Sequence, residues 1–180
     1  MKLIACLGNP GKKYSKNRHN AGFLAGEFIA QWYGIAASEK KFSSLCGSGI
    51  VENHKAIILF PQTYMNQSGI AVKAAIEYYD IAPENLIVIH DDIELPFKEV
   101  RAKFEGGHKG QNGVRSIIEH LETPDFFRIR VGVGRPPHPE MKVADYLLSD
   151  FSPEEQAFLE EIFSSVREQL VGIISRPKEN

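Results

Sequence analysis

The sequence predicts an α/β fold, a single-domain sandwich in which helices flank a central mixed, mostly parallel sheet. Apolar runs of strand length alternate with longer segments whose apolar residues recur at helical spacing, and this alternation is typical of strand–helix units. Two of the apolar runs are separated only by a short turn, so we expect them to pair antiparallel and make the sheet mixed. A chain of 180 residues fits one compact unit, and residues 1–180 should form a single domain.

The first half of the chain contains a strand, a helix and a hairpin. Residues 3–7 (LIACL) are a continuous apolar run, which is typical of a buried strand. Residues 20–33 have apolar side chains on one helical face, and Gly34 follows where that helix should end. The segments 48–51 and 55–60 flank a turn-prone Glu-Asn pair and should form the hairpin.

The second half continues the alternation of helices and strands. A helix should run from Thr63, acting as its N-cap, to about Tyr79. Residues 86–89 (LIVI) then read as a short buried strand. Beyond them we expect strands at 100–104 and 127–133 and helices at 113–121 and 153–174.

Composition excludes several classes of protein. A formal net charge of −2 argues against a protein that coats nucleic acid indiscriminately, because that mode needs a broad excess of Lys and Arg. The apolar runs are too short to span a bilayer, and residues 1–7 turn to Gly8 before a secretion signal is complete. Two cysteines provide neither a disulfide framework nor a metal-ligand spacing. We therefore expect a cytoplasmic protein with no membrane segment.

Four segments are rich in Asn, Gly and His rather than in core-forming residues. Each lies directly before or after an apolar segment, and the ligands of open α/β sheets gather at the carboxyl ends of the strands. One fold could therefore bring their polar side chains together in a catalytic or binding site. The segments are 8–22 (GNPGKKYSKNRHNAG), 61–69 (PQTYMNQSG), 90–96 (HDDIELP) and 106–113 (GGHKGQNG).

These segments, in this order and together with FFRIRVGVGRP at 126–136, resemble the bacterial-type peptidyl-tRNA hydrolases over nearly the whole chain. The resemblance implies a monomeric ester hydrolase that needs neither a metal nor another cofactor. Its substrate would be peptidyl-tRNA, bound by the acceptor stem and the CCA end. Cleavage would separate the C-terminal carbonyl of the peptide from the terminal ribose of the tRNA.

The residues themselves can support ester hydrolysis. His19 is the best candidate for the base, because an imidazole is partly neutral at cytoplasmic pH and can take a proton from water. Asp91 is the best candidate to hold its ring in the required tautomer. No G-x-S-x-G elbow is present, so direct attack by water is the simpler chemistry. His90 precedes the carboxylate on its strand and is expected to have a structural role.

Amide side chains should bind the reacting groups without adding charge. The resemblance implies that Asn9, Asn66 and Asn112 line the pocket, with Asn112 acting in catalysis and the other two binding substrate. It also assigns Asn20 to the substrate site. Met65 is either a pliable wall for peptide side chains or a core residue.

The tRNA requires phosphate and stacking contacts. The resemblance assigns Lys103 and Arg130 to the phosphate at the 5′ end of the acceptor stem, and Tyr14 to the wall near the terminal nucleotide. Lys109 and Arg115 could equally be ordinary solvated charges.

Three residues depart from the family pattern, namely Gln111 in place of the usual His, Glu105 beside the glycines, and Glu140. Each could weaken or retune tRNA binding. The Pro-rich segment 135–142 is expected to form a rim over the substrate groove. Two alternatives remain: a noncatalytic RNA-binding protein on the same fold, and a metal hydrolase that uses His19, His90, Asp91 and His108.

Overall fold

The computed structural model describes residues 1–177 and contains one seven-stranded sheet in the order β2-β3-β4-β1-β5-β7-β6. The strands are β1 (Lys2–Cys6), β2 (Glu39–Lys41), β3 (Ser44–Val51), β4 (His54–Pro61), β5 (Leu86–Asp92), β6 (Val100–Phe104) and β7 (Phe127–Gly132). The α-helices are α1 (Ala21–Trp32), α2 (Ser68–Tyr79), α3 (Asn112–Leu121), α4 (Val143–Leu147), α5 (Pro153–Gln156) and α6 (Leu159–Ile174). Short 3₁₀ turns are η1 (Lys12–Tyr14), η2 (Arg18–Asn20), η3 (Met65–Gln67) and η4 (Pro83–Asn85).

The sheet is mixed, as predicted. Strands β4, β1, β5 and β7 run parallel in its centre, and the expected hairpin is β3 with β4. Antiparallel strands complete both edges, β2 and β3 at one side and β6 at the other. The predicted fold class is therefore confirmed.

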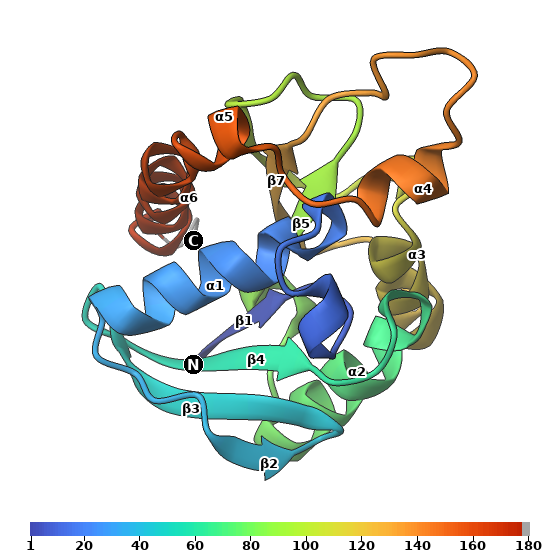
Figure 1. Ribbon diagram of the computed structural model, residues 1–180. Helices are drawn as coiled ribbons and strands as arrows, with labels where there is room; N and C mark the ends of the chain where they lie inside the picture. Colours follow the sequence, from blue (N-terminus) through green and yellow to red (C-terminus); the bar gives the residue numbers. More distant parts are fainter. Residues whose placement is uncertain (178–180) are drawn as a thin grey trace.

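Helices cover both faces of the sheet (Figure 1). Helices α1 and α6 pack on one face, and α2 and α3 pack on the other. Residues of β1 alternate between two cores, because successive side chains of a strand point to opposite faces. Ile4 and Cys6 join the core under α1 and α6, whereas Leu3 and Ala5 join the core under α2 and α3.

Two predicted elements differ in detail. Thr63 does not cap a helix, because α2 begins at Ser68 with Gln67 at the cap position, and the backbone N–H of Met65 is already bonded to the side chain of Asn9. The predicted helix 153–174 is divided into α5 and α6, and Phe158 between them turns toward Phe97 and Lys98.

Two short elements were not expected from the sequence. Strand β2 spans three residues (Glu-Lys-Lys) and α4 spans five, which is too short for hydrophobic periodicity to reveal. Strand β6 also runs opposite to its neighbour β7, so its carboxyl end lies at the far end of the sheet from those of the parallel strands. The segment 105–111 returns along the sheet and brings the start of α3 back to the end of β5.

Candidate active site

His19 lies just before α1 and above the end of β5. His19 belongs to η2, and Nδ1 of its ring lies 2.7 Å from Oδ2 of Asp91, a residue that is only 1% exposed. This contact depends on Gly22, because a Cβ atom there would lie 2.4 Å from the carbonyl oxygen of Ile89. Helix α1 can therefore rest directly on the sheet only with glycine at this position.

Two opposing effects act on the pKa of His19. Burial lowers the pKa because the imidazolium loses its hydration, whereas the charge of Asp91 and the hydrogen bond to it raise the pKa. The two effects of Asp91 together outweigh the effect of burial, so the pKa of His19 lies above its ordinary value. When the neutral ring donates its Nδ1 proton to Asp91, its Nε2 atom is left as an acceptor. Such a ring can remove a proton from water.

The second oxygen of Asp91 is held by Gln111. Its side-chain Nε2 donates to Asp91 Oδ1 at 3.0 Å, and its Oε1 accepts from the backbone N–H of Val114 at 2.8 Å as the N-cap of α3. Both carboxylate oxygens of the buried Asp91 thus have a hydrogen-bond partner. This bond links the His19 pair to the helix that begins with Asn112.

Asn9 and Asn20 form a reciprocal pair beside the histidine. The backbone N–H of Asn9 donates to Asn20 Oδ1 at 2.8 Å, and Asn20 Nδ2 donates to the carbonyl of Asn9 at 2.9 Å. The side-chain oxygen of Asn9 then accepts from the backbone N–H of Met65 at 2.7 Å. Asn20 therefore fixes the loop that carries Asn9, and Asn9 fixes the turn that carries Met65 and Asn66.

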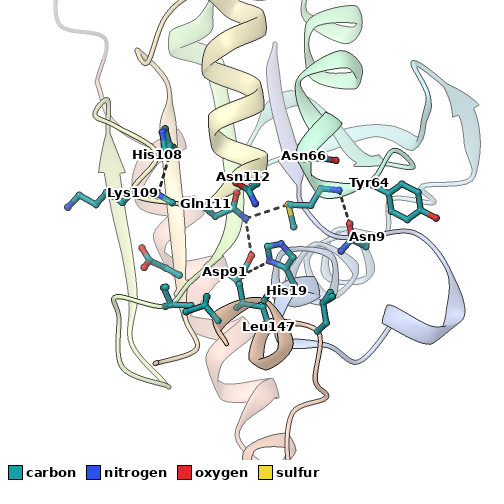
Figure 2. Close-up of a pocket in the computed structure, with 17 residues that line it drawn as sticks. Asn9, His19, Tyr64, Asn66, Asp91, His108, Lys109, Gln111, Asn112 and Leu147 are labelled. Carbon is teal, nitrogen blue, oxygen red and sulfur yellow. Dashed lines mark hydrogen bonds and ion pairs between the residues drawn. The ribbon is translucent and has the colours of Figure 1, made fainter. Parts of the chain in front are cut away.

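Asn9, Met65 and Asn66 line one cavity of about 350 Å³ together with His19 and Asp91, whereas Asn20 lies behind Asn9 and does not line it. Figure 2 draws the side chains that line this cavity. Asn66 and Asn112 lie on its exposed part, while Asn9 and Met65 are buried in its wall. Apolar side chains of α4 and its C-terminal flank close another side. The lining residues are Asn9, His19, Tyr64, Met65, Asn66, Asp91, Asp92, Ile93, His108, Lys109, Gly110, Gln111, Asn112, Val143, Ala144, Leu147 and Leu148.

Lys103 and Arg130 lie in a smaller adjoining cavity rather than in the main one. Arg130 Nε donates to Asp92 Oδ2 at 2.7 Å, and Asp92 lines both cavities. His90 also lines the smaller cavity, and burial lowers its pKa. His90 Nδ1 lies 2.7 Å from the carbonyl oxygen of Asp91, so the ring is held by the backbone.

The structure does not bring Tyr14 into the main cavity. Tyr14 is half-buried in η1, beside the ammonium group of Lys13 at 4.8 Å, while the exposed ring of Tyr64 lines the cavity instead. Tyr64 lies in the motif 61–69, which was the signal available for it in the sequence. Glu105 and Glu140 are exposed and line neither cavity.

Arg18 anchors the turn that carries the histidine. Its Nη1 atom donates to Ser149 Oγ at 2.6 Å and to the carbonyl of Asp150 at 2.9 Å, and its Nη2 atom donates to Glu155 Oε1 at 2.5 Å. The guanidinium also lies 4.4 Å from the ring centroid of Tyr146 in α4. Arg18 therefore links the turn that carries His19 to α4, which forms one wall of the cavity.

A metal-binding cluster and a membrane-spanning helix are both absent from the part of the chain that the structure describes. In residues 1–177, no group of three or more His, Cys, Asp or Glu side chains is arranged to hold a metal ion. Within the same range, no helix is long and apolar enough to cross a membrane.

The peptidyl-tRNA hydrolase family model matches residues 3–179. The chain belongs to the peptidyl-tRNA hydrolase family. Its relatives include the peptidyl-tRNA hydrolase of Geotalea daltonii, which is 46% identical over 98% of this chain and 91% of its own length. The peptidyl-tRNA hydrolase of Bacillus subtilis is 41% identical over 98% of this chain and 94% of its own length.

Solved structures of peptidyl-tRNA hydrolases have the same fold. The enzyme of Acinetobacter baumannii superposes with a TM-score of 0.87 at 38% identity, over 97% of this chain and 90% of its own. A peptidyl-tRNA hydrolase in complex with n-propanol superposes with a TM-score of 0.86 at 36% identity, over 100% of this chain and 97% of its own. As a peptidyl-tRNA hydrolase, this chain is an ester hydrolase of the translation machinery.

The four polar motifs of the sequence contain most of the residues that line the cavity. Of the expected residues, the fold gathers His19, Asp91, Asn9, Asn66 and Asn112 around it. It adds Gln111, whose amide binds Asp91, and the α4 residues, which carry no polar motif. A helix of five residues gives no sequence signal that would have predicted this wall.

Proposed function

We propose that this enzyme cleaves the ester bond of peptidyl-tRNA with a water molecule activated by His19 and supported by Asp91. The observation that carries the proposal is the 2.7 Å contact between His19 Nδ1 and Asp91 Oδ2 at the wall of the polar cavity. Free peptide and free tRNA are the products, and both return to translation.

The reaction needs one proton acceptor that later becomes a proton donor. Water between His19 Nε2 and the ester carbonyl loses a proton to Nε2 while its oxygen forms the new bond to the carbonyl carbon. Collapse of the tetrahedral intermediate breaks the bond to the ribose oxygen, and that oxygen receives the proton from His19. Asp91 keeps its own charge and stabilises the transient imidazolium.

Three amides are proposed to bind the reacting groups. The side-chain oxygen of Asn9 is occupied by Met65, so its Nδ2 group is the part free to donate to a peptide carbonyl. Asn66 and Asn112 lie on the exposed part of the cavity, and Asn112 is proposed to stabilise the oxyanion or hold the attacking water. Met65 would form the apolar wall, and Asn20 would hold Asn9 in place.

Lys103 and Arg130 are proposed to bind the 5′ phosphate of the acceptor stem, in the cavity that adjoins the cleavage site. Arg130 gives one donor to Asp92 and keeps others for a phosphate, since a guanidinium has five N–H groups. Tyr14 is proposed to stack near the terminal nucleotide, outside the cavity that encloses the ester.

Residues 1–180 are proposed to act as one catalytic domain, as a monomer, in the cytoplasm and without a cofactor. Light scattering of the purified protein should give a mass near 20.2 kDa. A mass of about twice that value at assay concentration would contradict the monomer.

The proposed chemistry is tested with purified peptidyl-tRNA, measuring cleavage and tRNA affinity separately. His19→Ala should lose about 10²- to 10⁴-fold in kcat while keeping most of its affinity. Asn112→Ala should lose about 10²- to 10³-fold. His54→Ala is the matched control, because His54 is exposed at the start of β4, away from the cavity. Normal turnover by His19→Ala would refute the assignment of the base.

A further inference from the structure

Gln111 joins the candidate catalytic pair to α3. The residue is 9% exposed and both ends of its amide are used. Its oxygen accepts from the backbone N–H of Val114, and its nitrogen donates to Asp91 and also lies 3.5 Å from Sδ of Met65. If the amide were reversed, its NH₂ group would face the N–H of Val114 and its oxygen would face the carboxylate of Asp91. Only the observed orientation therefore satisfies both contacts.

The bonds to Val114 and to Asp91 act on different groups. The bond to Val114 caps the first turn of α3, where Asn112 and Gly113 begin the helix. A Cβ atom on Gly113 would lie 2.6 Å from Sδ of Met65, so α3 packs tightly against the opposite wall of the cavity. The bond to Asp91 fixes the carboxylate rotation that also sets the plane of the His19 ring. One side chain thereby relates the position of the imidazole to that of Asn112.

We propose that Gln111 is a positioning residue: it orients the Asp91 carboxylate toward His19 and holds this pair in fixed relation to Asn112. The inference rests on the proposed function, because it concerns how the same site is held. Gln111 is not assigned a contact with substrate. It acts by way of Asp91, as a neutral donor to one oxygen while His19 binds the other.

The donor also limits the electrostatic effect of Asp91 on the imidazole. Without the Gln111 N–H, the carboxylate charge is less compensated, and the pKa of His19 should rise further. A second carboxylate at this position should act in the same direction. Besides Asp91, the charged or titratable side chains that line the cavity with His19 are Asp92 from β5, His108 and Lys109 from the segment 105–111, and Tyr64 before η3. Arg18 precedes His19 in η2 and is paired with Glu155, and α4 contributes only apolar side chains to the cavity.

Two variants separate the cap from the bond to Asp91. Gln111→Met has a similar length but removes both contacts, whereas Gln111→Glu keeps an acceptor for Val114 and loses the donor to Asp91. Gln67→Glu is the matched control, because Gln67 is also a helix N-cap residue, is exposed, and does not line the cavity. The titration midpoint of the His19 ring is measured by NMR, and the pH dependence of peptidyl-tRNA cleavage is measured in parallel.

We expect the His19 midpoint to move to higher pH in both Gln111 variants and to stay unchanged in Gln67→Glu. kcat should fall by about 10- to 100-fold with little change in KM, as expected for the loss of a hydrogen bond to a charged group. A His19 midpoint in Gln111→Met equal to that of the wild type would overturn the proposal, and Gln111→Glu decides by the same criterion if Gln111→Met does not fold. The NMR midpoint does not depend on turnover, so a failure of the proposed hydrolysis is seen separately, as wild-type protein without cleavage.

Discussion

Arg18 and Glu155 are 137 residues apart in the sequence and form a salt bridge of 2.5 Å immediately beside the candidate base. Glu155 also completes the capping box of α5 with Ser152. The pair is mostly shielded from solvent, with side-chain exposures of 11% and 19%. It joins the turn that carries His19 to the segment that follows α4.

Arg18→Met should therefore destabilise the protein by about 3 kcal/mol, because it leaves the mostly buried Glu155 carboxylate without a cationic partner. Chemical denaturation measures this change. Arg115→Met is the control, because Arg115 and Glu119 form an exposed pair with side-chain exposures of 58% and 61%, which should contribute less than about 0.5 kcal/mol. Equal losses in the free energy of unfolding of the two variants would show that the Arg18–Glu155 pair stabilises the protein no more than an exposed pair does.

Cleavage should depend on pH through the neutral form of His19. Because the pKa of His19 is raised, the rate should increase with pH through a midpoint above about 6.5. Asp91→Asn removes the charge that raises the pKa, so its midpoint should move to lower pH while kcat falls at least about tenfold. A midpoint in Asp91→Asn at or above the wild-type value would contradict this account.

The same ionisation contributes to stability in the opposite sense. A group whose pKa is higher in the folded state stabilises the protein fully below its unfolded pKa, about 6.5 for His, and loses that effect as pH rises through the folded pKa. The wild type should therefore lose more stability than His19→Gln when pH is raised from about 6 to about 8. Denaturation at a series of pH values measures the difference, and parallel curves would exclude the linkage.

Gly22→Ala should disturb the site and the fold together. The added methyl group would lie 2.4 Å from the carbonyl oxygen of Ile89, so α1 must move away from β5 and take His19 with it. We expect a loss of about 1–3 kcal/mol and a lower kcat. Gly172→Ala is the control, because nothing lies within 4 Å of its Cβ position in α6, and it should stabilise the protein by about 0.5–1 kcal/mol. A neutral Gly22→Ala would show that the close contact is not required.

Lys103→Ala and Arg130→Ala should weaken tRNA binding and reduce its salt dependence. Each lost phosphate contact should lower the slope of log Kd against log salt by about one. Lys55→Ala is the control, because Lys55 is exposed at the start of β4, away from both cavities. Unchanged slopes in the two test variants would remove these residues from the phosphate site.

Particular elements show what local pattern could and could not predict. The strand 100–104 was predicted with its observed bounds, because one apolar and polar alternation defines it. The direction of this strand could not be predicted from the alternation, because parallel and antiparallel strands have the same pattern. The strand runs antiparallel to β7, and this direction determines how the following segment brings Gln111 to Asp91. Tyr14 and Tyr64 lie in similar polar motifs, yet only Tyr64 lines the cavity.

The sequence by itself determined the alternation of strands and helices, the mixed sheet and the motifs that carry the site, because burial imposes a periodicity that nearby residues reveal. Tertiary structure decided which side chains meet. The contacts of Gln111 with Asp91 and of Arg18 with Glu155 join residues 20 and 137 positions apart. Such pairings depend on strand direction and on the path of the loops, which local periodicity does not encode.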